Sequence, residues 1–205
     1  MMWLLYMVIG IMALAAMLYL LGNYTFWLPF RGAKLPRIVM LHQVTPHEAA
    51  SGMNMPPQKF EQLLQYLAKK ETRFCFVSEL DQYRGQKNVV ALSFDDGFLD
   101  NYQYAYPLIK KYKAKATIYL ATQIEGIDKL NTQQIHEMSD SGVIEFGAHT
   151  QHHVNLLKLD DEEAYQEIQN SKLDVEALVG RCPSFAYPFG RFNEKHQQMA
   201  KEIGF

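Results

Sequence analysis

Short apolar stretches alternate along most of the chain with longer segments in which apolar residues recur at helical spacing. The short stretches are rich in Val, Ile, Phe and Tyr, which is typical of buried strands. They cover residues 38–41, 74–77, 89–92, 116–121, 143–148 and 184–187. Start signals predict helices from Pro57, Ser78, Asp100, Asn131, Asp160 and Asn193, with a kink at Pro107 in the segment 100–112. This alternation predicts about six parallel strands in βαβ units of one α/β domain.

The first 21 residues break this pattern because they are almost wholly apolar, and no Lys, Arg, Asp or Glu precedes Arg31. A helix rising 1.5 Å per residue over this length reaches across a bilayer core of about 30 Å. We therefore expect residues 1–30 to form one transmembrane anchor and its interface segment, contacting the membrane through residues 1–22. Trp3, Tyr19, Tyr24 and Trp27 suit the two interfaces. A cleaved signal peptide, which would make the protein secreted, is the alternative.

Composition supports one further domain, residues 31–205. The chain has 205 residues, of which 48% are hydrophobic and 20% charged, enough for a sizeable core. With a net charge of −2 and scattered Lys and Arg, the chain shows no basic surface that would attract nucleic acid. The only cysteines, Cys75 and Cys182, match no zinc pattern. They either form one disulfide or, more simply, are two buried thiols.

Candidate chemistry lies where predicted strands end. Asp95 and Asp96 follow the strand 89–92, and His149 and His153, four residues apart, follow the strand 143–148. An Asp-Asp-Gly turn would explain the first pair by itself. Together the Asp and the two His form the nitrogen and oxygen set of a catalytic divalent metal site. His42 ends the first strand, where it is either a core histidine or a third functional side chain.

Parallel strands of a barrel-like α/β fold bring their carboxyl ends to one rim. The three strand ends with His42, Asp95/Asp96 and His149/His153 therefore favour such a fold with one functional rim. The strand count predicts a (β/α) barrel that is short of closure.

The motifs SFDDG and HTQHH, in this order, resemble the first two motifs of the polysaccharide deacetylases, which share NodB homology and form carbohydrate esterase family 4. The resemblance covers residues 37–205. It implies a distorted (β/α) barrel in which Asp96, His149 and His153 bind the metal and Asp95 is the catalytic base. It also implies that Thr150 braces the histidine loop. Family members usually continue past Phe205, so we expect a C-terminally short domain.

Two further motifs are similar to the branch that deacetylates poly-β-1,6-N-acetylglucosamine. In FAYPFG the resemblance implies that the backbone N–H of Phe189 stabilises the oxyanion, although an aromatic turn is the simpler reading of this motif alone. In Met40-Leu41-His42 it implies that His42 is the catalytic acid. Ala186 stands where many relatives have an arginine that orients the base, a residue which this branch also lacks. His152 has no role in the family pattern and leaves the choice of ligands open.

We therefore expect a metal-dependent N-deacetylase whose partner is a polysaccharide, first poly-β-1,6-N-acetylglucosamine and then peptidoglycan or a chitin-like glycan. Zinc is the first candidate metal, and cobalt, nickel, iron and manganese fit the same ligands. A non-catalytic glycan-binding relative and an amidohydrolase of small N-acyl compounds are the alternatives. Arg31, Lys34 and Arg37 follow the apolar segment, which by the positive-inside rule favours a cytoplasmic domain. The resemblance implies an extracellular domain at the cell membrane, and we expect that placement.

Overall fold

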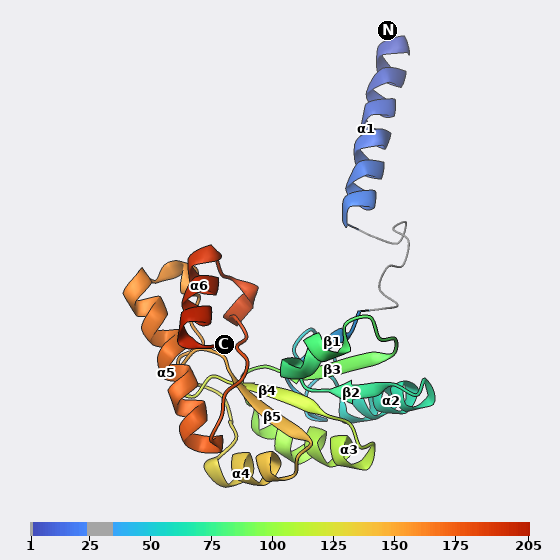
Figure 1. Cartoon of the computed structure of the whole chain (residues 1–205). Coiled ribbons are helices and arrows are strands. Elements are labelled where there is room, and N and C mark those ends of the chain that lie inside the picture. Colours follow the sequence, from blue (N-terminus) through green and yellow to red (C-terminus); the bar gives the residue numbers. More distant parts are fainter. Residues whose placement is uncertain (1, 24–34) are drawn as a thin grey trace.

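Five parallel strands form the centre of the computed structural model, which describes residues 2–23 and 35–205 (Figure 1). The strands are β1 (Arg37–Leu41), β2 (Arg73–Cys75), β3 (Val89–Phe94), β4 (Ala116–Leu120) and β5 (Ile144–Ala148). Their order is β1-β3-β4-β5, and β2 pairs with the first half of β3. The predicted α/β class with a parallel sheet is confirmed. Among the described residues β1 pairs with no strand except β3, so the sheet is open at that edge.

Helices cover one face of this sheet. They are α2 (Pro57–Lys69), α3 (Tyr106–Lys111), α4 (Thr132–Asp140) and α5 (Asp161–Val179), with short 3-10 segments such as η3 (Val77–Tyr83) between elements. The last helix, α6 (Glu194–Ile203), packs against α5. The main core lies between this layer and the sheet, where Phe94 of β3 meets Phe60 of α2 edge to face. Side chains alternate along a strand, so Leu92 and Phe94 enter this core whereas Ser93 and Asp95 face the opposite side.

The predicted helix starts are confirmed where a polar side chain caps the first turn. Asn131, Asp160 and Asn193 each accept a hydrogen bond from the backbone N–H three residues on. Pro57 occupies the first position of α2. An N–H at this position would have no acceptor within the helix, so proline costs no hydrogen bond there. These starts depend on neighbouring residues alone, which explains why local sequence signals located them.

Two predicted elements are wrong in detail. The segment 100–112 is not one helix kinked at Pro107. A π-helical turn, η4 (Asn101–Ala105), precedes α3, and Pro107 lies in the first turn of α3, which tolerates it. The segment 184–187 is not a strand, because only Phe185 pairs with a neighbour, in a single parallel bridge to Ala148. The sheet therefore has five strands instead of about six.

The apolar N-terminal segment forms helix α1 (Met2–Asn23). The expected transmembrane helix is not found among residues 2–23 and 35–205, since none of their helices has the length and apolar character that a bilayer requires. Tyr24, Trp27 and the predicted domain boundary at residue 31 lie outside the described residues. Cys75 and Cys182 are free and buried, so the alternative of a disulfide is wrong.

Candidate metal centre and catalytic pocket

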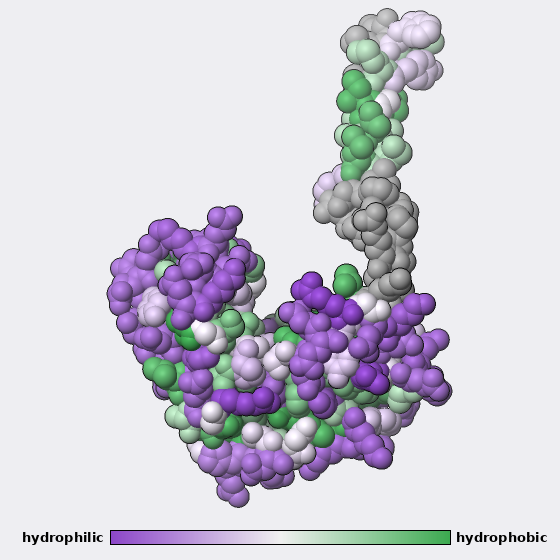
Figure 2. Space-filling view, in the orientation of Figure 1, coloured by the Kyte–Doolittle hydropathy of each residue, from purple (hydrophilic) through white to green (hydrophobic). Residues whose placement is uncertain are grey.

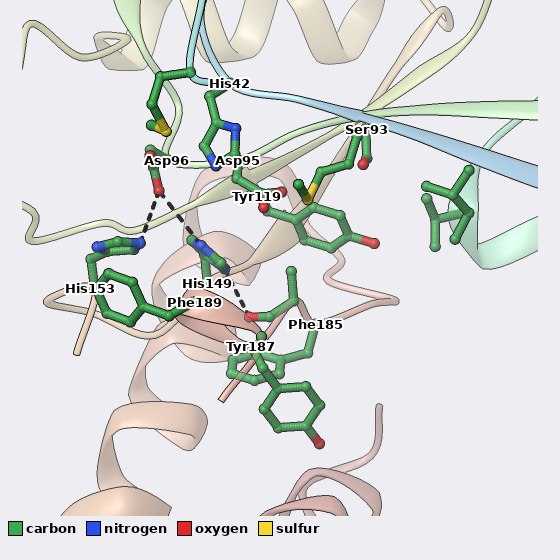
Figure 3. Close-up of a pocket in the computed structure, with 16 residues that line it drawn as sticks. His42, Ser93, Asp95, Asp96, Tyr119, His149, His153, Phe185, Tyr187 and Phe189 are labelled. Atoms are coloured by element: carbon green, nitrogen blue, oxygen red, sulfur yellow. Dashed lines mark hydrogen bonds and ion pairs between the residues drawn. The ribbon is translucent and has the colours of Figure 1, made fainter. Parts of the chain in front are cut away.

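The predicted site residues meet at the carboxyl ends of three strands. His42 follows β1, Asp95 and Asp96 follow β3, and His149 follows β5, with His153 one short loop further on. Figure 3 shows these side chains turned toward one another around Asp96. Parallel pairing produces this arrangement, because neighbouring strands end at the same edge of the sheet.

Asp96, His149 and His153 present three ligand atoms to one small space. The Oδ1 atom of Asp96 lies 3.5 Å from Nε2 of His149 and 3.2 Å from Nε2 of His153. One ligand atom from each residue lies within 4.8 Å of the others, and the two rings are 5.1 Å apart. Asp96 and His149 are buried, so water competes little for these atoms. The group is consistent with a divalent metal site.

The tautomer of His149 supports this interpretation. Its Nδ1 donates to the carbonyl of Ala186 at 2.8 Å, since a carbonyl can only accept. Burial lowers the pKa of His149 to about 3, so the ring is neutral and its Nε2 carries a free lone pair. That lone pair faces the Asp96 Oδ1 atom, which is buried and makes no hydrogen bond with the described residues. Two acceptors facing each other repel unless a cation lies between them, so the residues fit a metal ion.

The backbone around the site is strained. Seven non-glycine residues in the described part of the chain have positive φ, and four of them are Asp96, Thr150, His153 and Phe189. Such conformations cost roughly 1–3 kcal/mol each and persist only where surrounding contacts hold them. Their concentration here indicates that the fold positions these residues for binding and not for local stability.

Asp95 is the second carboxylate of the site, and it is buried like Asp96. Burial, followed by the charge of Asp96, raises the pKa of Asp95 to about 7. Burial also raises the pKa of Asp96, although the nearby His153 opposes this. A bound cation would favour the ionised form of both. The Asp95 backbone N–H donates to the carbonyl of Leu41, which joins the ends of β3 and β1.

His42 is buried less deeply than His149, and its Nδ1 has no hydrogen-bond partner among the described residues. Burial lowers the pKa of His42, and the charge of Asp96 acts in the opposite direction. The His42 backbone carbonyl accepts from Nδ2 of Asn101 at 2.9 Å, and Asp100 accepts from the Val44 N–H at 3.0 Å. The chain that follows SFDDG therefore holds the loop that carries His42.

Phe189 lies in the 3-10 segment η6 (Pro188–Gly190) and packs its ring 4.6 Å from that of His153. The N–H groups of Gly190 and Arg191 are bonded within this turn. The Phe189 N–H makes no hydrogen bond to the described residues, so a donor is free beside the cluster. Ala186 contributes its backbone carbonyl to the hydrogen bond with His149.

A pocket of about 660 Å³ opens above these residues and follows the sheet face opposite the helices. Met40 of β1 and Phe189 form parts of its wall and are more than half exposed. Figure 2 shows the molecule hollowed between the parts that carry β1 and α6. Sequence reasoning missed Ser93 and Tyr119, which line the floor. Tyr119 lies two residues after Thr117 in a buried strand. Side chains two residues apart share a face of the sheet, so this alternation could have placed Thr117 and Tyr119 on the pocket side.

His152 is not part of the cluster. Its Nδ1 contacts Oε1 of Glu167 at 2.6 Å, and none of its atoms belongs to the group of convergent ligands. The structure therefore favours His149 and His153 over His152 as the pair that acts with Asp96.

Comparisons with known proteins agree with this geometry. The family profile for polysaccharide deacetylases matches residues 82–205. The Bacillus subtilis protein YxkH is 30% identical over 183 residues, covering 84% of this chain and 63% of its own. A poly-β-1,6-N-acetyl-D-glucosamine N-deacetylase of Staphylococcus epidermidis is 26% identical, covering 72% of this chain and 57% of its own. This chain thus spans less than two thirds of the length of these curated relatives.

Solved structures show the same fold. A Streptococcus pyogenes deacetylase, PplD, determined with acetate, is 28% identical with a TM-score of 0.76 and covers 83% of this chain and 81% of its own. IcaB from Ammonifex degensii is 25% identical with a TM-score of 0.76 and covers 84% of this chain and 82% of its own.

Proposed function

Because the chain belongs to the polysaccharide deacetylase family, we propose that it hydrolyses N-acetyl groups of an N-acetylglucosamine polymer and releases acetate. The observation that carries this proposal is the convergence of Asp96, His149 and His153 beside a second buried carboxylate, Asp95. A structural metal site would need no such carboxylate. A hydrolytic site needs one, because a proton must leave the attacking water.

Asp96, His149 and His153 would hold a divalent cation, zinc first and cobalt, nickel, iron or manganese as alternatives. A cation of this kind polarises an amide carbonyl and makes water a stronger acid. The Ala186 carbonyl keeps the Nε2 lone pair of His149 directed at the site. Asp96 has a left-handed backbone and is buried, so its carboxylate is kept away from bulk water.

Asp95 accepts a proton from the attacking water as the new C–O bond forms. The Phe189 N–H donates a hydrogen bond to the amide oxygen while that oxygen gains negative charge. His42 donates a proton to the amine as the C–N bond breaks. One water is consumed, acetate and a free amine leave, and exchange with solvent returns Asp95 and His42 to their starting protonation states. These three roles are proposals that the positions around one pocket support.

The β-1,6-linked polymer is the first choice of substrate, followed by peptidoglycan and chitin-like glycans. The deacetylases of that polymer are among the curated relatives at 26% identity. The half-exposed walls of the pocket also suit a polymer better than a small N-acyl compound, which would favour an enclosed cavity. An extracellular domain stays a prediction. Protease treatment of intact cells tests it, and survival of the domain until lysis would contradict it.

The test is acetate release from short β-1,6 N-acetylglucosamine oligomers by the full chain, first stripped of metal and then reloaded with zinc or cobalt. Asp96→Asn should abolish the metal-dependent release. Asp140→Asn, which changes an exposed carboxylate at the end of α4, should leave it unchanged. Metal binding without release from this glycan or from peptidoglycan fragments would refute the hydrolase and favour the glycan-binding alternative.

A further inference from the structure

The loop that joins the two proposed histidine ligands is tied to helix α5 by the carboxylate of Glu167. Glu167 lies in the middle of α5 and its side chain is 14% exposed. Its Oε2 accepts the backbone N–H groups of Gln151 at 2.9 Å and His152 at 3.1 Å. Its Oε1 contacts Nδ1 of His152 at 2.6 Å. Both oxygens are therefore engaged by the residues that lie between His149 and His153.

A second carboxylate extends this attachment. Asp174 follows Glu167 by seven residues, which is close to two turns, so both project from the same face of α5. Its Oδ2 accepts from Nε2 of Gln151 at 2.8 Å and from Oγ1 of Thr122 at 2.6 Å. The Gln151 carbonyl accepts from the N–H of Gln123 at 2.7 Å. The tip of the loop is thus fastened to α5 and to the end of β4.

The loop needs such ties because its backbone is strained at both ends. Thr150 has φ of 60° and His153 has φ of 54°, a region that L residues with side chains rarely adopt. Thr150 supports the loop itself with one hydrogen bond of 3.3 Å, accepted from the Val154 N–H. Without outside contacts, the loop would relax toward conformations in which His149 and His153 do not face the same point.

Helix α5 is a suitable support. It begins at a capping box formed by Asp160 and ends at Gly180 in a left-handed conformation, and its buried residues pack against the sheet and α6. A group held on this helix therefore has a fixed position relative to β5, which carries His149.

We propose that Glu167 is a positioning residue of the metal centre: its carboxylate holds the backbone between His149 and His153 so that both imidazoles face Asp96. His152 completes this contact and is not a ligand. The inference rests on the proposed metal site. It assigns a function to His152, whose place in HTQHH the family pattern leaves unexplained.

The experiment measures the dissociation constants of Co²⁺ and Zn²⁺, and the visible spectrum of the Co²⁺ form, for the full chain and five variants, one of which is His149→Ala as the reference for loss of a ligand. Glu167→Ala should weaken metal binding by about tenfold, the lower end for residues that support metal ligands, and should alter the Co²⁺ spectrum. Glu167→Gln should weaken it less, because the amide oxygen still accepts a backbone N–H. His152→Ala should change affinity by less than about threefold, since both backbone bonds to Oε2 remain.

Glu162→Gln is the matched control, because it removes an exposed charge from the same helix. It should leave affinity and spectrum unchanged. If Glu167→Ala does not fold, as judged by thermal unfolding of the metal-free chain, Glu167→Gln keeps the side-chain volume and decides the question. A loss for Glu167→Gln that disappears in about 1 M salt would reflect charge alone and would overturn the inference.

Three further outcomes separate the hypotheses. A wild-type chain that binds no metal would overturn the proposed function and this inference with it. A wild-type chain that binds metal, with Glu167 variants equal to it in affinity and spectrum, would overturn the inference alone. A His152→Ala variant that loses as much affinity as His149→Ala would make His152 a ligand and would also overturn it.

Discussion

Replacing Gly147 by alanine would place a methyl group too close to three atoms of neighbouring residues. A Cβ at this position would lie 2.6 Å from Cδ1 and Cε1 of Tyr119 and 2.7 Å from the carbonyl oxygen of Ser184. Gly147 is the last but one residue of β5, and its φ is not in the left-handed region, so the effect is one of space and not of backbone strain.

Neither neighbour can move freely. The Tyr119 ring is 4% exposed, and the Ser184 carbonyl accepts the Ala148 N–H at 3.0 Å in the bridge that holds residues 184–186 against β5. Overpacking of this kind costs typically 1–3 kcal/mol. We expect a loss of about 2 kcal/mol in the free energy of unfolding, which for a chain of this size lowers Tm by roughly 4–8 °C.

A shift of the Ser184 carbonyl away from the added methyl group should also affect the metal centre. The bridge also places the Ala186 carbonyl, which orients His149, so Gly147→Ala should weaken metal binding as well as stability. Gly52→Ala is the control, because nothing lies within 4 Å of the added methyl group and no positive φ is needed there. Thermal unfolding and Co²⁺ titration measure the two effects. A Gly147→Ala chain as stable as the Gly52→Ala chain would refute the packing argument.

Other predictions follow from the site and its supports. Asp95→Asn should abolish acetate release while metal affinity is retained, and His42→Ala should slow release while sparing metal binding; loss of metal from the His42 variant would contradict its role as the acid. Asn101→Ala leaves the His42 carbonyl without its partner and should lower the free energy of unfolding by about 1–3 kcal/mol, measured by denaturant titration; an unchanged midpoint would contradict this. Burial raises the pKa of Glu145 above its ordinary value of 4.5, against the bonds from Ser78 and Arg181. Folding therefore favours its protonated form, and this stabilisation is present at low pH and lost as pH rises through the folded-state pKa. Relative to wild type, Glu145→Gln should thus gain stability as the pH rises above the ordinary pKa of 4.5, and a relative loss in denaturation experiments would contradict the sign.

The sequence by itself determined the features that depend on neighbouring residues. The helix starts at Asn131, Asp160 and Asn193 were predictable because a cap bonds three residues along the same chain. The metal group was predictable for a related reason. Asp96 ends one strand and His149 ends another, and parallel strands necessarily bring those ends to one edge. The spacing of four between His149 and His153 then predicted that both imidazoles could reach one ion.

Tertiary structure alone decided what distant segments do to one another. Whether His152 or His153 faces Asp96 depends on Glu167, which is 15 residues away on a helix that packs against β5. The segment 184–187 has a strand-like composition, yet it forms a single bridge, and its Ala186 carbonyl fixes the tautomer of His149. The π-helical turn after SFDDG places Asn101 under His42, 59 residues earlier in the chain. Such contacts leave no periodic signal in the sequence, because each depends on where two independently formed elements lie in space.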